Sequence, residues 1–389
     1  MQKILIVINS MSVGGIQKAL LNLLKELSKK TQYDITLLLI NEKGDYLEEI
    51  PANIKVECAN QWWSLLETSN REAKERGTKY WLARSFLALL IKLGRRDLAT
   101  TLLAMTQKKY REYDVAISYR QPDIETNVIG GTAEFVRKCC YADKKVIFIH
   151  CDYSLYGGNC RYNSKQLEQF DRVAVVSNSC IQKLLQCVPQ IRSKVACVYN
   201  CQDYEDIRKK AEDNSVVYRK NRPIIVSVSR LGAEKGIDRA IAALTKLKKS
   251  GMNFEWHIIG DGEERERLKK LSEDQEMTDC IYFEGGTTNP YRYMKNADMF
   301  FLPSYHEAAP MVIGEAICLG IPVLATNTSS AYEFVGTHGM VCDNTAEGIE
   351  HGLKTMLCQH PDNYRMYYAA NEKKLSNDEA LQQFTEVCK

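Results

Sequence analysis

The sequence lacks the features of membrane-spanning and secreted proteins. No uninterrupted apolar run reaches the roughly 18 residues that a spanning helix needs. The opening stretch, MQKILIVINSMSVGG, holds a short apolar strand but neither the longer apolar core nor the small-residue cleavage site of a signal peptide. We therefore expect a cytoplasmic protein.

Metal and redox motifs are missing as well. The 14 cysteines form no Cys-x-x-Cys pair, and cysteines at core positions of a reduced protein behave as small apolar residues. The nearest candidate for a metal cluster is Cys139, Cys140, His150 and Cys151, whose spacing fits no standard zinc site. No Asp-x-Asp pair stands at the end of a predicted strand. We predict that the protein needs neither a metal nor a cofactor.

An excess of one charge is absent overall but present in one segment. The formal net charge of +3 is too close to balance to indicate a nucleic-acid partner. Between residues 71 and 112, however, there are 11 lysines and arginines and only 4 acids. The same segment holds the large apolar residues Trp81, Leu82, Phe86, Leu87, Leu89, Leu90, Ile91 and Leu93. This composition fits an interfacial helix on an anionic membrane, or a helix that faces the core and solvates its basic side. We favour membrane contact through residues 71–111.

Short β-branched runs alternate with amphipathic helices along the chain. Its length of 389 residues exceeds what a single hydrophobic core usually serves, so we expect two domains. We predict strands at 4–8, 35–40, 115–118, 146–150, 173–176 and 195–198 in the first half, and at 224–228, 254–259, 281–283, 299–302, 322–325 and 340–342 in the second. Near-continuous apolar strands between helices indicate parallel sheets covered on both faces. The expected fold is therefore α/β, with two doubly wound, Rossmann-like domains facing across a cleft.

Composition also suggests where these domains begin and end. We expect the N-terminal domain at 1–203, a polar, highly charged linker at 204–222, the second domain at 223–363 and C-terminal helices at 364–389.

Gly14 and Gly15 follow the first predicted strand and immediately precede a helix with apolar residues at helical spacing. Glycine lets a backbone turn sharply and approach an anion, while a helix N-terminus offers free N–H groups and positive potential. The Gly-x-Gly-x-x-Gly pattern of dinucleotide sites is absent. On these residues alone, a phosphate site and a tight turn without a ligand are equally good interpretations.

The first strand of the second half leads to a pair of cations, Arg230 at its carboxyl end and Lys235 just before a new helix. Two cations at that edge suit a diphosphate, because a guanidinium forms paired bonds to phosphate oxygens and an ammonium acts as a point charge. The alternative is two surface cations paired with Glu234 and Asp238. Their position at the edge where α/β sheets bind ligands favours the anion site.

Two glutamates stand eight residues apart in the stretch PSYHEAAPMVIGEAICLGIPVLAT, residues 303–326. We expect a helix that opens at Pro310, where a missing N–H is tolerated, with Glu307 in the loop before it and Glu315 inside it. Either these glutamates bind a ligand, or Glu307 caps the helix and Glu315 is a solvated helix residue.

Four stretches together carry a family resemblance: GGIQKALLNLL at residues 14–24, FIHCDYS at 148–154, SRLGAEKG at 229–236 and HEAAPMVIGEA at 306–316. In this order they resemble family 4 of the retaining glycosyltransferases, a GT-B group that includes many enzymes of bacterial polysaccharide synthesis. The combination of Arg-x4-Lys-Gly with Glu-x7-Glu is the most specific part. Ala308 departs from the glycine that commonly follows the first glutamate.

The resemblance implies a role for each candidate residue. It places Glu307 beside the donor sugar and Glu315 at the ribose of the donor nucleotide. It assigns Arg230 and Lys235 to the departing diphosphate.

Backbone and cross-cleft contacts are implied in the same way. Ala309, Met311 and Val312 would offer N–H groups to the diphosphate and sugar, since Pro310 has none. His150 would lie near the transferred sugar, and without the resemblance it is a packed histidine at a strand end.

The implied reaction is metal-independent, retaining transfer of a sugar, with a UDP-sugar as the expected donor. The acceptor would be a glycan or a polyprenyl-diphosphate-linked glycan. The alternatives are a GT-B nucleotide-sugar epimerase or hydrolase, and a scaffold that binds a nucleotide sugar without catalysis.

Overall fold

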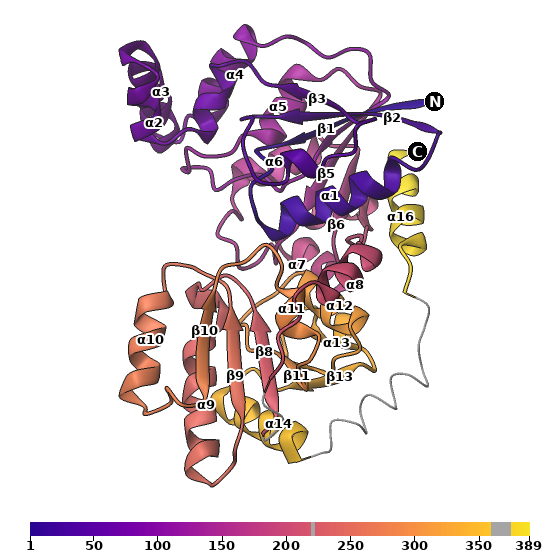
Figure 1. The fold of residues 1–389 in the computed structure, drawn as a ribbon. Coiled ribbons are helices and arrows are strands. Elements are labelled where there is room, and N and C mark those ends of the chain that lie inside the picture. The colour runs from indigo at the N-terminus through magenta and orange to yellow at the C-terminus, as the bar shows by residue number, and fades with distance from the viewer. Residues whose placement is uncertain (219–221, 359–374) are drawn as a thin grey trace. The chain divides into compact units, whose positions relative to one another are not determined.

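The computed structural model describes residues 1–218, 222–358 and 375–389, and all structural statements below concern these residues. The chain divides into two compact units (Figure 1): unit 1 comprises Met1–Cys201 with Asn377–Lys389, and unit 2 comprises Gln202–Ser376. Within the described ranges, no helix is both long and apolar enough to cross a bilayer.

Unit 1 is built on a parallel sheet of seven strands in the order β3-β2-β1-β4-β5-β6-β7. Its strands are β1 (Gln2–Ile8), β2 (Tyr33–Leu39), β3 (Lys55–Cys58), β4 (Val115–Ser118), β5 (Lys144–Ile149), β6 (Arg172–Val175) and β7 (Val195–Cys197). Its α-helices are α1 (Gly15–Leu27), α2 (Asn70–Glu75), α3 (Thr78–Lys92), α4 (Arg96–Thr106), α5 (Thr132–Cys139), α6 (Arg161–Glu168), α7 (Asn178–Cys187) and α16 (Asp378–Cys388). Short 3-10 turns are η1 (Leu47–Glu49), η2 (Trp63–Glu67) and η3 (Pro189–Lys194). The strand order reverses between β1 and β4.

Unit 2 repeats this plan with six parallel strands in the order β10-β9-β8-β11-β12-β13. Its strands are β8 (Ile224–Val228), β9 (Glu255–Ile259), β10 (Ile281–Gly285), β11 (Met299–Leu302), β12 (Val323–Thr326) and β13 (Gly339–Cys342). Its helices are α8 (Tyr204–Glu212), η4 (Ala233–Lys235), α9 (Ile237–Lys249), α10 (Arg265–Asp274), α11 (Tyr291–Met294), α12 (Met311–Cys318), α13 (Ala331–Val335) and α14 (Ala346–Cys358). Here the order reverses between β8 and β11.

Apolar strands bury both faces of the unit 2 sheet. Met299 and Phe301 of β11 join the core that α9 and α14 cover, whereas Phe300 and Leu302 join the core under α8, α11 and α12. Successive side chains of a strand point to opposite faces, so a continuous apolar run needs cover on both. This confirms the predicted doubly wound α/β architecture.

Each predicted strand is present, and the sequence analysis missed one, β3. This edge strand reads Lys-Val-Glu-Cys and is mostly exposed. Short, charged strands are typical of sheet edges, and they lack the apolar run by which the other strands were found.

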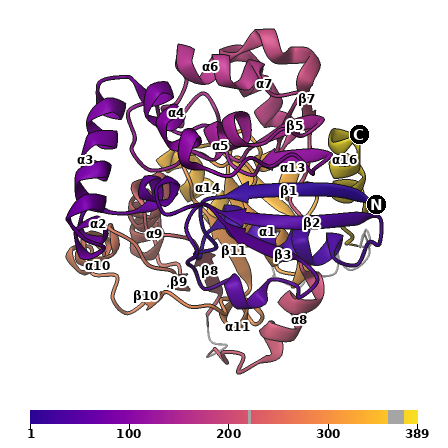
Figure 2. The same cartoon turned by 90° about the horizontal axis from the view of Figure 1, so that it is seen from above.

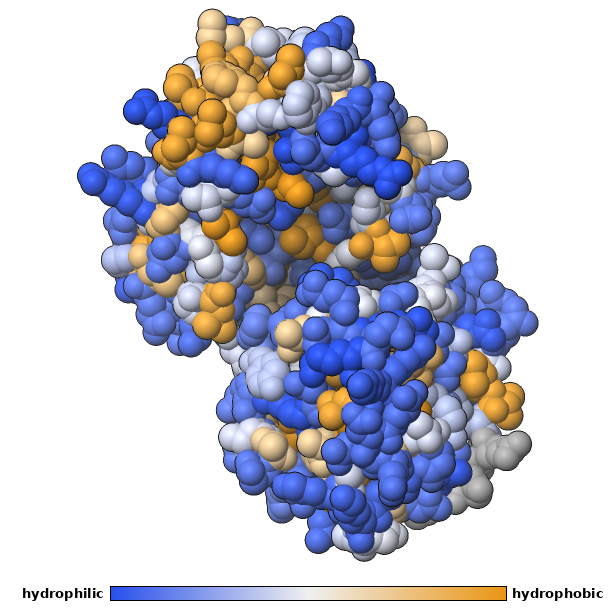
Figure 3. All heavy atoms as spheres, turned by 90° about the vertical axis from the view of Figure 1, so that its left-hand side faces the viewer, coloured by the Kyte–Doolittle hydropathy of each residue, from blue (hydrophilic) through white to orange (hydrophobic). Residues whose placement is uncertain are grey.

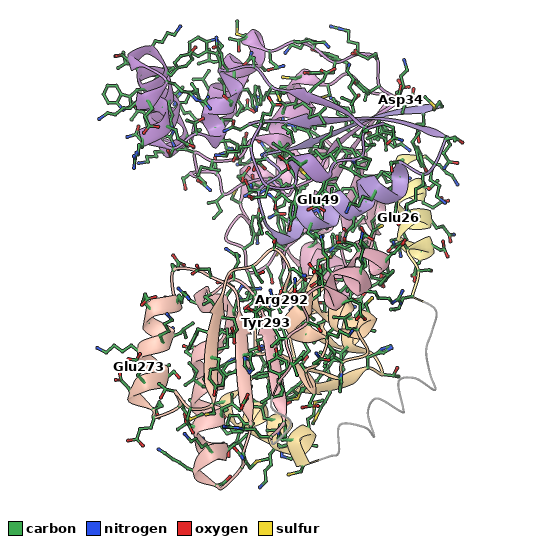
Figure 4. All side chains as sticks on the ribbon, viewed as in Figure 1. Glu26, Asp34, Glu49, Glu273, Arg292 and Tyr293 are labelled. Carbon is green, nitrogen blue, oxygen red and sulfur yellow. The ribbon has the colours of Figure 1, made fainter. Side chains whose placement is uncertain are left out.

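Residues 204–222, predicted to be a linker, begin with the helix α8, which is part of unit 2. The stretch after α8 is also bound to unit 2. The Val216 N–H donates to the carbonyl of Arg292 over 2.9 Å, and the Tyr218 hydroxyl donates to the carbonyl of Tyr293 over 2.8 Å (α11; Figure 4). High charge therefore marked a helix and a following stretch that is hydrogen-bonded to unit 2, rather than a free connection.

The C-terminal helix α16 packs on unit 1. Gln2 donates to the carbonyl of Cys388 over 3.0 Å, and the hydroxyls of Tyr33 and Thr385 lie 2.9 Å apart. The predicted C-terminal segment began at residue 364, and its part before residue 375 lies outside the described residues.

The basic segment 71–111 forms three helices, α2, α3 and α4, rather than one interfacial helix. The guanidinium of Arg96 is fully buried, with its Nε 2.6 Å from Glu134 Oε1 and one Nη 3.6 Å from Asp123 Oδ2. Although burial alone would raise the pKa of Glu134, Arg96 holds it below its ordinary value. Arg96 is thus a core residue and takes no part in any surface contact.

We predict that Glu134→Ala destabilises unit 1 by about 3–5 kcal/mol, because it leaves the Arg96 charge buried without its closest partner. Urea unfolding followed by tryptophan fluorescence measures this, since the buried Trp63 packs edge-on against Phe135 beside Glu134. The matched control is Glu75→Ala, which breaks the exposed pair with Arg71 and should leave the midpoint nearly unchanged. Equal midpoints for the two variants would contradict a structural role for Arg96.

Candidate active site

An ion pair bridges the point at which the strand order of unit 2 reverses. Lys235 follows β8 and Glu307 follows β11, and Lys235 Nζ lies 2.8 Å from Glu307 Oε1. Both side chains are largely buried, with 18% and 12% of their surface exposed. The Ser304 hydroxyl donates to the same carboxylate oxygen over 2.7 Å. In open α/β sheets this reversal, at the carboxyl ends of the strands, is where ligands bind.

Arg239 of α9 holds the loop that carries Glu307 in place. This guanidinium donates to the carbonyls of Pro303 over 2.6 Å and Ser304 over 2.9 Å, and it lies 3.8 Å from the ring centre of Tyr305. Gly236 has a left-handed φ of 63°, and an added Cβ would lie 2.3 Å from the Pro303 carbonyl oxygen. The turn after Lys235 therefore needs glycine, and this close packing holds Lys235 against Glu307.

Helix α12 begins at Met311, one residue later than predicted, because Pro310 is the extended N-cap with ψ of 104°. The interpretation that Glu307 caps this helix is wrong, since no side-chain cap is present among the described residues and the Glu307 carboxylate binds Lys235 and Ser304 instead. Met311 and Val312 lie in the first turn, where helix geometry leaves N–H groups without an intrahelical acceptor. Ala309 lies in the preceding loop, half-buried.

Glu315 lies inside α12 and is only 5% exposed, so the interpretation that it is a solvated residue is also wrong. The Tyr291 hydroxyl donates to Glu315 Oε1 over 3.1 Å and orients the carboxylate. The first turn of α12 is held by Gln202, which donates to the Met311 carbonyl over 2.9 Å. A buried carboxylate with a fixed orientation suits recognition of a hydroxyl pair better than helix solubility.

Arg230, unlike Lys235, has an exposed side chain. Its side chain is 79% exposed and pairs with Glu234 at 3.0 Å, which is the surface-pair alternative raised from the sequence. The neighbouring Ser229 hydroxyl is buried and makes no hydrogen bond to the described residues. The loop after β8 thus combines one fixed cation, one exposed cation and one unsatisfied hydroxyl.

Gly14 and Gly15 lie at the reversal of unit 1, but their backbone does not require glycine. Gly14 is extended, with φ of 176°, and Gly15 begins α1 outside the left-handed region. A Cβ on Gly15 would meet no atom within 4 Å. The chain bends at Val13 and Gly14 without a left-handed φ, and approach of an anion to this backbone stays a prediction.

The sequence analysis missed a polar cluster at this same edge, formed by Asn9, Glu67 and Arg120. Asn9 follows β1 and Arg120 follows β4, and Arg120 Nη1 donates to Asn9 Oδ1 over 3.1 Å. The Asn9 amide in turn donates to Glu67, while Arg120 pairs with Asp123 at 3.2 Å. Burial raises the pKa of Glu67 to about 7, and Arg120 only partly opposes this. None of the three belongs to a sequence motif, so only the fold reveals them.

His150 follows β5 at the same edge. Its ring centre lies 4.8 Å from that of Tyr119 and 5.8 Å from that of Phe148. Its Nε2 atom is buried without a hydrogen-bond partner among the described residues. Burial lowers the pKa of His150 to about 3, and Arg120 adds to this shift. The imidazole is therefore neutral at physiological pH, and its buried Nε2 atom has no partner among the described residues.

Comparisons with known proteins show what this chain resembles. Residues 208–374 match the protein family described as Glycosyl transferases group 1. The matched segment covers most of unit 2 and includes Lys235, Glu307 and Glu315.

Several curated relatives are named as glycosyltransferases of polysaccharide synthesis. The putative colanic acid biosynthesis glycosyltransferase WcaL of Salmonella typhimurium is 35% identical over 138 residues, 32% of this chain and 34% of the relative. The O-antigen biosynthesis glycosyltransferase WbnH of Escherichia coli is 24% identical over 271 residues, 66% of this chain and 75% of the relative. The match to several relatives, WcaL among them, spans less than half of their length.

The fold is that of solved GT-B glycosyltransferases. The structure of HepE of Anabaena in complex with UDP and glucose has a TM-score of 0.64 and 19% identity, with 99% of both chains covered. A glycosyltransferase of Rickettsia africae has a TM-score of 0.65 and 20% identity, with 100% of this chain and 97% of that one covered. This confirms the predicted GT-B fold.

We predict that Glu67→Gln raises stability at alkaline pH and leaves it unchanged at acid pH. A carboxyl whose pKa is raised on folding stabilises the folded state below its unfolded pKa of 4.5, and loses that contribution as pH rises through about 7. Urea unfolding at pH 4 and pH 8.5 measures the difference. The control Glu49→Gln removes a more exposed carboxylate in unit 1, and the same pH response in both variants would contradict the shifted pKa.

Proposed function

We propose that this protein transfers a sugar from a nucleoside-diphosphate-sugar to a hydroxyl of a glycan. The observation that carries the proposal is the Lys235–Glu307 pair at the strand reversal of unit 2, inside the segment that matches the glycosyl transferases group 1 family. A UDP-sugar is the proposed donor, which the UDP complex of the structural neighbour HepE supports.

Each donor group has a proposed partner in unit 2. Departure of the nucleoside diphosphate builds negative charge on phosphate, which Lys235 and the first-turn N–H groups of α12 stabilise without rearranging and to which Arg230 adds a mobile charge. Arg230 suits this role because its exposed side chain can leave Glu234 for a phosphate at little cost. Glu315 binds the ribose hydroxyls, held in place by Tyr291.

The sugar itself lies beside Glu307 in this proposal. Lys235 and Ser304 occupy one carboxylate oxygen of Glu307, and together they orient the group towards a sugar hydroxyl. We propose retention of anomeric configuration by same-face attack, in which a donor phosphate oxygen assists removal of the acceptor proton. Glu307, already bonded to a lysine, is poorly suited to be a nucleophile.

We place the acceptor at the carboxyl edge of the unit 1 sheet, where Asn9, Glu67, Arg120 and neutral His150 gather. These groups mix hydrogen-bond donors with acceptors, as recognition of sugar hydroxyls requires. The acceptor class we propose is a glycan of cell-surface polysaccharide synthesis, free or polyprenyl-diphosphate-linked, used by a cytoplasmic enzyme that contacts the membrane. The polysaccharide roles in the names of the curated relatives support this class.

We predict that UDP-sugars raise the thermal unfolding temperature of the purified chain while a chelator is present throughout. A ligand that binds only the native state stabilises it by about 2.7 kcal/mol at a hundred times its Kd. A panel of UDP-, GDP-, ADP- and CMP-sugars and NAD measures the donor class. A shift with NAD alone would contradict the proposed donor, and a UDP-sugar shift that appears only when the chelator is left out would contradict metal independence.

We predict that Glu307→Ala and Lys235→Ala each lower transfer about a hundredfold, because each removes a charge preorganised for the transition state. Release of UDP in the presence of a glycan acceptor measures the rate. The control variants Lys246→Ala and Glu350→Ala break an exposed ion pair of the same unit, at 3.2 Å, and should transfer normally. Normal turnover in the two site variants would mean that the site is misplaced. UDP release that does not depend on an acceptor would instead indicate a hydrolase.

A further inference from the structure

Helix α3 has apolar residues on two opposite faces. Leu82, Phe86, Leu89 and Leu93 recur at the spacing of a single helix face and are 53–64% exposed. Leu87 and Ile91 lie on the opposite face and are buried in unit 1. A helix needs only one apolar face to pack on a core, so the exposed face has another purpose or an energetic cost.

Helix α4 repeats this arrangement. Leu98, Leu102 and Met105 share one face and are 39–78% exposed, while Leu103 and Ala99 on the other side are buried. Gly94, with a left-handed φ of 70°, turns the chain between the two helices. We call the seven exposed side chains of α3 and α4 the α3–α4 face.

The figures place this face at the margin of unit 1. In Figure 1 and Figure 2, α2 and α3 lie at the outer side of the unit, away from its sheet. Figure 3 views this side and shows apolar residues gathered on unit 1 with hydrophilic residues around them. Among the described residues, no element of unit 1 covers these side chains, which leaves them to a partner.

Basic side chains flank the face. Lys79, Lys92 and Arg95 are exposed beside it. Tyr80, seven residues before Leu87, lies on the packed side of α3, where its ring centre is 5.3 Å from that of Trp62. Exposed basic side chains beside an apolar helix face are typical of helices that lie at the interface between headgroups and acyl chains.

Charge complementarity distinguishes a bilayer from a second copy of the chain. A symmetric dimer through this face would bring two basic margins together, whereas anionic headgroups would neutralise both Lys79 and Lys92. The acidic Asp97 beside the face is already paired with Lys138 at 2.9 Å. Arg84 lies on the packed side of α3 and donates to the Thr68 carbonyl, so it takes no part.

We propose that the α3–α4 face rests in the headgroup region of an anionic bilayer, with its leucines and Phe86 inserted and Lys79, Lys92 and Arg95 on the lipid phosphates. This anchors unit 1 as a peripheral protein. It deepens the proposed function, because it would hold the acceptor edge of unit 1 near lipid-linked glycans, and it has a test that does not depend on transfer.

The test is flotation of the full chain with vesicles of equal parts phosphatidylcholine and phosphatidylglycerol, at low salt, against vesicles of phosphatidylcholine alone. The variant Leu82→Ser/Phe86→Ser/Leu89→Ser should lower the partition coefficient at least about tenfold, because three inserted apolar groups are lost. The variant Lys79→Gln/Lys92→Gln/Arg95→Gln should lose about fivefold per charge on anionic vesicles and nothing on neutral ones.

Matched controls change exposed groups elsewhere. Leu155→Ser/Val217→Ser replaces apolar side chains that are 59% and 85% exposed, and Lys29→Gln/Lys246→Gln/Arg267→Gln removes three exposed charges. Both should float like the wild type. All the substituted residues are exposed or outside the core, so circular dichroism should show unchanged folding.

Absence of flotation by the wild type, or equal flotation of the apolar variant, would overturn the proposal. A wild-type dimer in sedimentation that the apolar variant converts to a monomer would assign the face to a second copy instead. The UDP thermal shift of each variant keeps the two proposals apart. If the wild type shows no thermal shift with UDP, the sugar-transfer function is contradicted. Flotation still decides the role of the α3–α4 face.

Discussion

All strands of a parallel sheet end at the same edge, and where the strand order reverses, the chain leaves that edge in two directions. In unit 2 this constraint brings Lys235 and Glu307, 72 positions apart, to within 2.8 Å. The rest of the site is arranged around this pair. Arg239 and Gly236 fix its two loops, Ser304 shares its oxygen, and α12 begins directly after it. A mostly buried ion pair is a poor source of stability, so its position at a binding edge is better explained by a ligand.

Unit 1 meets the same constraint with different chemistry. Its reversal joins Asn9 to Arg120, 111 positions apart, through a neutral amide that also binds Glu67. The unit 2 edge holds the fixed cation Lys235 and the exposed cation Arg230, which suit the proposed diphosphate. The unit 1 edge instead mixes a carboxyl whose pKa burial raises to about 7, an amide, a guanidinium and an uncharged imidazole. This difference supports the division of labour that we propose, with the donor on one unit and the acceptor on the other.

The sequence predicted those features that depend on local pattern. Apolar runs located the strands, and the spacing of Glu307 and Glu315 located the loop and helix of the site. It failed where partners are brought together by topology: the burial of Arg96 follows from Glu134 and Asp123, and no spacing links these three residues. Charge also misled, because a highly charged stretch is compatible with a linker and with a surface helix such as α8. Gly14 and Gly15 show the converse, since a plausible motif adopted an ordinary backbone.

The segment 71–111 shows why two interpretations of one pattern need not exclude each other. From composition, α3 was either a membrane helix or a helix packed on the core. The structure shows core packing through Leu87 and Ile91, with a separate apolar face at Leu82, Phe86 and Leu89 left exposed. Apolar residues on opposite faces cancel in the hydrophobic periodicity, so the sequence carries no strong amphipathic signal there. A helix that binds a protein core on one side and a lipid surface on the other needs apolar residues on both faces. Weak hydrophobic periodicity is then expected of a helix with two interfaces, and it does not indicate a helix without any.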